Sequence, residues 1–252
     1  MSEQPTVWGT GSNKQASAKV ALAEFLKNAP AHSDLLIANL PLYLRSVILA
    51  KILYVNEIYS RILPIPGVVM EFGVWWGANM SLLNSMRNVY EPYNFNRRVI
   101  GFDTFAGYPK PGERDGAFAE VATSGHDQLP EGYDKYLEEV LACHESENAL
   151  EHIRKFQIVK GDVTQTVDRY LSDNPQTMVA LAYLDVGMYD GTKHVLKALR
   201  PHLVPGSIIA MDSLNSSVFP GETQAFREVM GSEGWSIRRS QYLPDRSYVI
   251  VD

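Results

Sequence analysis

Cysteine is nearly absent: Cys143 is the single one in a chain of 252 residues. One thiol cannot form an internal disulfide, and alone it cannot supply the ligands of a zinc cluster. The polar residues 1–13 also lack the charged start and the apolar run of a secretory signal. Because a reducing compartment suits such a protein, we expect it to be cytoplasmic.

A basic excess is missing as well, since the formal net charge is −6. Nucleic-acid backbones bind basic surfaces, so we expect no nucleic-acid partner. Long uninterrupted apolar runs are missing too. The most apolar N-terminal stretch, residues 40–63, is interrupted by Arg45, Lys51, Glu57 and Arg61, which argues against membrane insertion. We expect a helix that packs on the rest of the chain or on a second subunit.

Apolar residues make up 45% of the chain, enough for a packed core. From residue 68 onward, short apolar runs alternate with segments of helical periodicity. This alternation predicts an α/β fold with a doubly wound, mostly parallel seven-stranded sheet, closed by an antiparallel pair. We expect residues 1–66 to form a helical N-terminal extension and 67–252 a single domain. The predicted strands are 68–72, 99–102, 156–160, 178–184, 207–211, 235–242 and 247–251; the predicted helices are 14–28, 42–62, 79–89, 133–150, 163–171, 191–203 and 222–230.

Acidic residues end four consecutive strands of this prediction: Asp103, Asp162, Asp185 and Asp212. Aspartate is common at strand ends as a helix cap, so any one of them alone indicates little. Ligands of parallel sheets bind beyond the carboxyl ends of the strands, however, and all four would lie there. The set therefore favours a ligand site at this edge.

A glycine turn, Gly73 to Gly77, follows the first predicted strand and precedes a helix. Such a turn lets the backbone approach a ligand, and Asp103 could then accept the ribose hydroxyls of an adenosine group. Asp162 would be placed near the adenine amino group. Dinucleotides and S-adenosylmethionine compete as ligands. The pattern is E-x-G-x-x-x-G, and Glu71 in the turn region would repel a pyrophosphate but suit a cationic methionyl group.

Three segments carry a resemblance to a known family: residues 71–77 (EFGVWWG), 101–109 (GFDTFAGYP) and 184–192 (LDVGMYDGT). Together they resemble the macrocin O-methyltransferase family, which methylates deoxysugar hydroxyls of macrolides and related products. The resemblance implies the class I methyltransferase fold, S-adenosylmethionine as cofactor and, for many members, Mg²⁺. It assigns five residues to the cofactor: Glu71, Gly73, Gly77, Asp103 and Asp162. We add the neighbouring Thr104 and Gly161 as candidates for cofactor binding.

The resemblance also assigns Asp185 and Asp212 to the metal, and here the chain departs from the family. Ser213 stands where the family usually has a second aspartate, and Gly187 where an aspartate is common. Two carboxylates with Ser213 could still hold Mg²⁺ together with water.

Residues 108–132 form a long connection after the second strand, which we interpret as a loop that covers the substrate. It contains His126, a candidate general base, with Asp185 as the alternative.

The sequence thus predicts an S-adenosylmethionine-dependent O-methyltransferase that acts on a hydroxyl of a small molecule, namely a sugar or deoxysugar of a natural product or glycan. It also predicts a homo-oligomer. Two alternatives remain open. One is a Mg²⁺-dependent methyltransferase of catechols or other phenols. The other is a non-catalytic, cofactor-binding partner subunit.

Overall fold

The structure, a computed structural model, describes residues 12–252 apart from 117 and 124–127. Contacts divide the chain into two units, Met1–Lys51 and Ile52–Asp252, each of which is described by itself. The second unit begins before residue 67, where the sequence places the start of the domain. The reason is the helix α3 (Ser46–Arg61), because its Tyr54, Val55 and Ile58 lie in the core of the second unit.

The N-terminal unit contains α1 (Asn13–Lys27), α2 (Ser33–Ala38), η1 (Leu40–Tyr43) and the first turns of α3. Ser12 and Gln15 begin α1 with a reciprocal capping box. The helix expected over 42–62 is divided, because Leu44 is extended between η1 and α3. Within the described residues, no helix is long and apolar enough to cross a membrane.

The second unit is built on one seven-stranded sheet in the order β3-β2-β1-β4-β5-β7-β6. The five strands from β3 to β5 pair in parallel, whereas β7 is antiparallel to both β5 and β6. This confirms the predicted fold, including the antiparallel closing pair. The strands are β1 (Val68–Phe72), β2 (Val99–Asp103), β3 (Phe156–Lys160), β4 (Val179–Leu184), β5 (Leu203–Met211), β6 (Trp235–Arg239) and β7 (Ser247–Val251).

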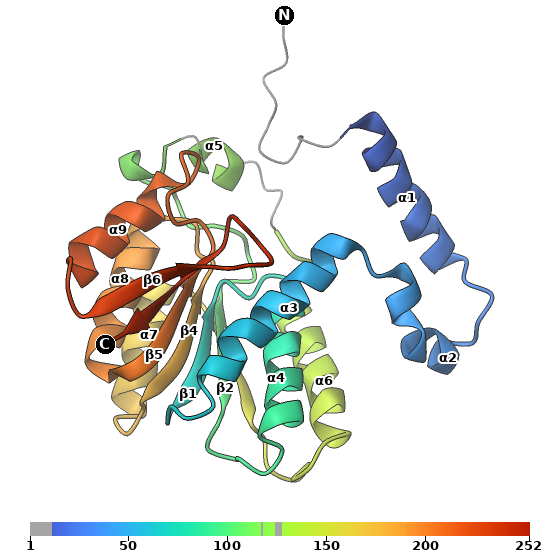
Figure 1. Cartoon of the computed structure of the whole chain (residues 1–252), viewed down its shortest axis with the longest axis horizontal. Coiled ribbons are helices and arrows are strands. Elements are labelled where there is room, and N and C mark those ends of the chain that lie inside the picture. Colours follow the sequence, from blue (N-terminus) through green and yellow to red (C-terminus); the bar gives the residue numbers. More distant parts are fainter. Residues whose placement is uncertain (1–11, 117, 124–127) are drawn as a thin grey trace, which may run out of the picture. The chain divides into compact units, whose positions relative to one another are not determined.

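Helices cover both faces of this sheet, as Figure 1 shows. Successive strand residues point to opposite faces, so Val69 joins one core with α3, α4 and α6, and Met70 joins the other with α7, α8 and α9. Both faces are therefore buried, as a mostly parallel sheet requires. The covering helices are α4 (Ala78–Tyr90), α6 (Tyr133–Ser146), α7 (Val163–Asp173), α8 (Tyr189–Leu199), which continues into η3 (Arg200–His202), and α9 (Pro220–Met230).

The segment 108–132 is more structured than the sequence suggests. It contains η2 (Glu113–Asp115) and α5 (Phe118–Thr123), which are too short to show a periodic pattern. The Asp115 carboxylate accepts the N–H groups of Gly112 and Tyr189, both at 2.7 Å. The ring of Phe118 packs against Phe219. The described part of the segment is therefore tied to the starts of α8 and α9.

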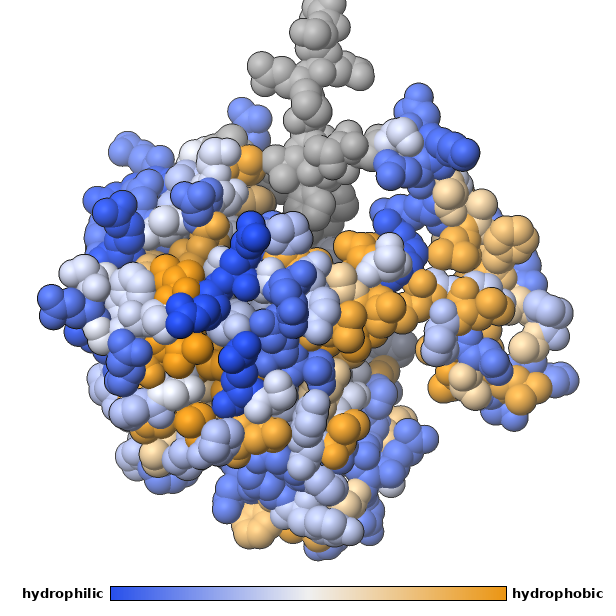
Figure 2. All heavy atoms as spheres, in the orientation of Figure 1, coloured by the Kyte–Doolittle hydropathy of each residue, from blue (hydrophilic) through white to orange (hydrophobic). Residues whose placement is uncertain are grey.

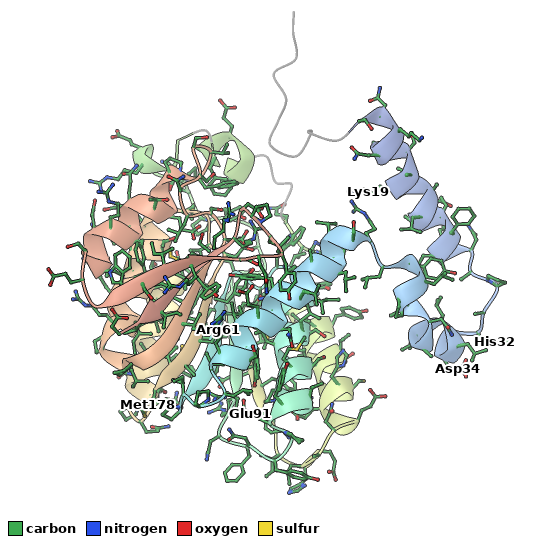
Figure 3. The ribbon with its side chains drawn as sticks, in the orientation of Figure 1. Lys19, His32, Asp34, Arg61, Glu91 and Met178 are labelled. Carbon is green, nitrogen blue, oxygen red and sulfur yellow. The ribbon has the colours of Figure 1, made fainter. Side chains whose placement is uncertain are left out.

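One buried arginine fixes the connection from α3 to β1. Arg97 donates to the carbonyls of Ile62 (3.0 Å), Ile65 (2.7 Å) and Gly67 (2.6 Å). Its Nε lies 2.9 Å from Oε2 of Glu91, the residue that follows α4 and is labelled in Figure 3. Buried carbonyls need donors, and Arg97 supplies three of them from one side chain. It thereby sets where β1, the strand that leads to the ligand edge, begins.

We predict that Arg97→Met lowers the free energy of unfolding by about 3–5 kcal/mol, because it removes the cation that pairs with Glu91 and the side-chain donor to three carbonyls. Arg98→Met is the matched control. Arg98 makes one hydrogen bond, to Gln157, and its loss should cost about 1 kcal/mol. Urea unfolding followed by circular dichroism measures both. Equal stability of the two variants would contradict this role of Arg97.

Candidate functional site

The four strand-end aspartates lie along one edge of the sheet. Asp103 is the last residue of β2, and Asp162, Asp185 and Asp212 follow β3, β4 and β5. In the order of the strands the edge runs from Asp162 through Asp103 to the glycine turn after β1, and then to Asp185 and Asp212. The carboxyl ends of these parallel strands thus bring acidic side chains and a glycine turn together, as the sequence predicts.

Asp103 holds two backbone turns at once. Its Oδ2 accepts the N–H of Trp75 at 2.8 Å, and its Oδ1 accepts the N–H of Phe105 at 2.7 Å. Both aromatic residues have left-handed backbones, with φ of 50° and 55°. Bulky residues rarely adopt this conformation, which costs about 1–3 kcal/mol each and clusters at functional sites. The two hydrogen bonds compensate for that cost, so Asp103 fixes the backbone turns after β1 and β2.

The glycine turn brings the loops after β1 and β4 into contact. Gly73 has φ of 90°, and a Cβ there would lie 2.1 Å from the carbonyl oxygen of Asp185. At Gly77, with φ of 77°, a Cβ would lie 2.3 Å from the side chain of Leu137. A side chain at Gly73 would therefore displace the loop after β4, and one at Gly77 would force the side chain of Leu137 to move. Both predicted glycines are required by the path of the backbone.

Glu71 lies in β1, within the predicted strand 68–72 and just before the glycine turn. Its side chain is 1% exposed, and its residue pairs in register with Gly101 and Tyr183. Asn79, in the first turn of α4, is also buried. Neither its Oδ1 nor its Nδ2 has a hydrogen-bond partner among the described residues. Such an amide at the start of a helix suits a polar ligand.

Thr104 and Gly161 build the loops on either side of Asp103. The Thr104 hydroxyl donates to the carbonyl of Gly107 at 2.6 Å and closes the turn that follows β2. The N–H of Gly161 donates to the backbone carbonyl of Asp103 at 2.8 Å. Both residues therefore position backbone at the ligand edge.

Asp162 acts as the N-cap of α7. Its Oδ1 accepts both the N–H and the hydroxyl of Thr164, each at 2.8 Å. This is the helix-capping role that the sequence analysis set beside a ligand role. The cap holds the carboxylate at the edge, and contact with an adenine group stays a prediction.

Asp185 and Asp212 directly follow β4 and β5, which are adjacent strands of the sheet. The N–H of Asp185 donates to Phe72 at 2.8 Å, and the N–H of Asp212 donates to Leu184 at 3.2 Å. Each ladder is thereby extended by one bond beyond the ends of β4 and β5. The backbone of both residues is held in the sheet, so their carboxylates are presented at fixed places.

Arg246, which the sequence analysis did not single out, pairs with Asp212. Its Nε forms an ion pair with Oδ1 of Asp212, and its Nη1 donates to the backbone carbonyl of Asp212 at 2.8 Å. The buried Tyr183 hydroxyl donates to the same Oδ1 at 3.2 Å. Burial, and next the charge of Asp212, raise the pKa of Tyr183 well above its usual value, so the phenol keeps its proton.

Glu222 is a second residue that the sequence analysis missed. It is buried near the start of α9, and its Oε1 accepts the N–H of Ser213 at 3.3 Å. Burial raises the pKa of Glu222 well above its usual value, and the charges of Asp212 and Asp185 raise it further. Nothing in its sequence position distinguishes it from an ordinary acidic residue in the first turn of a helix.

The contacts of Asp212 bear on the predicted Mg²⁺ site of Asp185, Asp212 and Ser213. A divalent cation requires several oxygen ligands pointing at one position. Here an arginine already holds Oδ1 of Asp212, and the backbone N–H of Ser213 faces Glu222. In the part of the chain that the structure describes, no three His, Cys, Asp or Glu side chains form a group that could hold a metal ion. As arranged, these residues do not fit Mg²⁺.

His126, the first candidate for the general base, lies outside the described residues. Asp185, the alternative candidate, lies at the ligand edge beside the glycine turn. The assignment of a base to either residue stays a prediction.

Comparison with known proteins identifies the family of the chain. Residues 54–232 match the family described as macrocin O-methyltransferase (TylF). The crystal structure of CalS11, a calicheamicin methyltransferase, is 38% identical, with 99% of this chain and 98% of that chain covered and a TM-score of 0.92. Comparison with curated proteins yields no match.

Two further structures agree in fold. The apo structure of CalS11, described as a TDP-rhamnose 3′-O-methyltransferase of calicheamicin biosynthesis, has 38% identity, 95% coverage of both chains and a TM-score of 0.84. The O-methyltransferase NovP, at 16% identity, covers 80% of this chain and 79% of its own with a TM-score of 0.60, which shows the fold alone. The chain belongs to the macrocin O-methyltransferase family and is an S-adenosylmethionine-dependent O-methyltransferase.

Proposed function

We propose that this enzyme methylates a hydroxyl of a deoxysugar that is carried on a nucleoside diphosphate. The observation that carries the proposal is the 38% identity, across 95% of both chains, to a protein described as a TDP-rhamnose 3′-O-methyltransferase. Identity at this level extends over both units of the chain. The same class of acceptor is therefore the best supported one.

The residues at the carboxyl edge of the sheet fit S-adenosylmethionine, which supplies the methyl group when bound. We assign Asp103 to the ribose and Asp162, with Gly161 and Thr104, to the adenine side of the pocket. Gly73 and Gly77 leave the backbone bare at the start of α4, where free N–H groups suit a carboxylate. Glu71 would face the cationic methionyl group, and the buried amide of Asn79 would gain a hydrogen-bond partner.

The chemical task of the chain's own residues is to orient the acceptor hydroxyl and to take its proton. Holding a nucleophile in line with the reacting carbon removes much of the entropic barrier of a bimolecular step. A general base contributes about 10²–10⁴-fold in rate. We assign this role to His126 or Asp185. Asp185 follows β4 at the ligand edge, and His126 lies outside the described residues.

We further propose that the enzyme is a homo-oligomer in which the N-terminal unit contacts a second copy. The helices α1, α2 and η1 contain no buried residue, so the described part of this unit lacks a core of its own. Figure 2 shows hydrophobic side chains gathered on α1 and α2. Apolar surface of this extent favours burial in an interface. The exposed apolar residues are Val20, Phe25, Leu35, Ile37, Leu40, Leu42, Leu44, Val47, Ile48 and Leu49.

We predict that Asp103→Ala weakens binding of S-adenosylhomocysteine at least about tenfold, because hydrogen bonds to a charged acceptor are worth roughly 1.5–3 kcal/mol. The loss also frees the two strained turns. Asp173→Ala, an exposed aspartate at the far end of α7, is the control and should bind normally. Isothermal titration measures both. Normal affinity in a folded Asp103→Ala protein would remove the ribose assignment.

We predict that dTDP-rhamnose is methylated with a kcat/KM at least about tenfold above that for a free methyl rhamnoside or a catechol, since a site built for polar groups rejects substrates that lack them. Transfer of a ¹³C-methyl group, followed by NMR, identifies the modified oxygen. A preference for catechol would favour the phenol alternative. Cofactor binding without turnover of any acceptor would favour a partner subunit.

We predict that the protein sediments as a dimer or a larger assembly at micromolar concentration, and that Ile37→Asp with Leu42→Asp shifts it toward the monomer. A charge placed in an apolar interface must be desolvated, which opposes association. Val89→Asp is the matched control, because Val89 is an exposed apolar residue of α4 in the second unit. Sedimentation velocity distinguishes the species. A monomeric wild-type protein would contradict the proposal.

A further inference from the structure

The pair of Arg246 and Asp212 stands where the family resemblance implies a metal ion. Arg246 contacts Asp212 twice, through the ion pair to Oδ1 and through the bond to its backbone carbonyl. Its side chain is 26% exposed and that of Asp212 is 12% exposed, so both are largely withdrawn from water. Charged groups at such depth are costly to unpair. The contact is therefore a built part of this edge.

The antiparallel end of the sheet explains why these residues meet. In the pairing of β5 with β7, Ala210 lies opposite Tyr248 and Met211 opposite Ser247. One step further along the same ladder, Asp212 and Arg246 lie opposite each other, at the separation where side chains interact. Two backbone bonds, from Ser240 to Arg246 and from Arg246 to Leu243, close the turn that presents the arginine.

Other contacts fix the Asp212 carboxylate from the opposite side. The Tyr183 hydroxyl donates to the same oxygen, Oδ1, from the neighbouring strand β4. The family's usual second aspartate is replaced by Ser213, whose N–H is turned to Glu222. A divalent cation would thus find a neutral serine in place of one carboxylate, and at Asp212 a carboxylate that is already paired with Arg246.

We propose that Arg246 holds the Asp212 carboxylate in place of a divalent cation and acts as a positioning residue for methyl transfer. The guanidinium neutralises Asp212 and fixes its orientation beside Asp185 at the ligand edge. The enzyme then works without Mg²⁺, and Ser213 is the residue that accompanies this change. The activity part of this inference rests on the proposed function, whereas the metal-binding part requires only the folded protein.

The first experiment measures Mn²⁺ binding by electron paramagnetic resonance in the full-length protein with S-adenosylhomocysteine present. Wild type should bind no Mn²⁺ at Asp212, so that Asp212→Asn leaves the spectrum unchanged. Arg246→Met should gain a Mn²⁺ site, because it removes the guanidinium from Asp212, which lies near Asp185 and Glu222. Adding Asp212→Asn to Arg246→Met should remove that site. Wild-type binding that Asp212→Asn abolishes would overturn the proposal, whether or not any acceptor has been found.

The second experiment measures methyl transfer to whichever acceptor wild type accepts. Excess chelator should change the wild-type rate less than twofold, whereas loss of turnover that Mg²⁺ restores would overturn the proposal. Arg246→Gly should lose at least tenfold in kcat with little change in KM for the cofactor. Arg246→Lys should retain part of that rate. Added guanidinium at millimolar concentration should restore Arg246→Gly, a rescue that a merely structural role would not give.

Arg239→Gly is the control for this series. Arg239 is an exposed arginine of β6, and its loss should alter neither the rate nor the response to guanidinium. Thermal melting establishes that each variant is folded. If Arg246→Gly does not fold, the wild-type chelator and Mn²⁺ measurements still decide. A folded Arg246→Gly enzyme with normal turnover would overturn the positioning role.

Discussion

The ligand edge depends on the contacts of one residue, Asp103. Its two carboxylate oxygens hold the turns after β1 and β2, and its backbone carbonyl accepts the N–H of Gly161 after β3. Three loops that come from separate parts of the sequence thus meet at a single residue. The left-handed backbones of Trp75 and Phe105 are stable only because these hydrogen bonds hold them. A pocket formed in this way is organised before any ligand arrives.

Close packing, and not hydrogen bonds, joins the next two loops of the edge, those after β1 and β4. Gly73 lies so near the carbonyl of Asp185 that no side chain fits between the loops after β1 and β4. A shift of Asp103 would move the first loop, and the first loop would move Asp185 in turn. The positions of Asp185, a candidate base, and of the glycine turn are therefore linked, because packed interiors transmit small displacements.

Much of the fold could be predicted because its signals are local. Strands β1, β3 and β7 begin and end where the apolar runs do, and the aspartates mark the ends of the parallel strands. The misses have physical causes. Helices α2 and α5 are one or two turns long, too short for a period of 3.6 residues to appear. The burial of Glu71 within the predicted strand could not be foreseen, since burial of a carboxylate is decided by tertiary packing.

The site was predictable to the same extent as its backbone. Gly73, Gly77 and Asp103 could be recognised from the sequence, because turns at strand ends need particular residue types. Arg246 does not: it lies 34 residues after Asp212, and only the pairing of β5 with β7 brings the two together. Partners across non-local strand pairs leave no pattern in a single sequence. The family resemblance led to a metal ion as the expectation for Asp212, and no pattern in the sequence pointed to an arginine instead.

Charge compensation explains how so many acids can share one edge. Asp103 is satisfied by two backbone N–H groups, Asp162 by Thr164 and Asp212 by Arg246. Burial and the nearby aspartates raise the pKa of Glu222, which favours its neutral form and removes one charge from the cluster. These three aspartates are thus fixed by donors of the protein itself, so this part of the edge can keep its shape with or without a cation bound. The sulfonium cofactor that we propose for this edge would meet a preorganised geometry, and the fixed donors leave no need for an unpaired negative charge in the core.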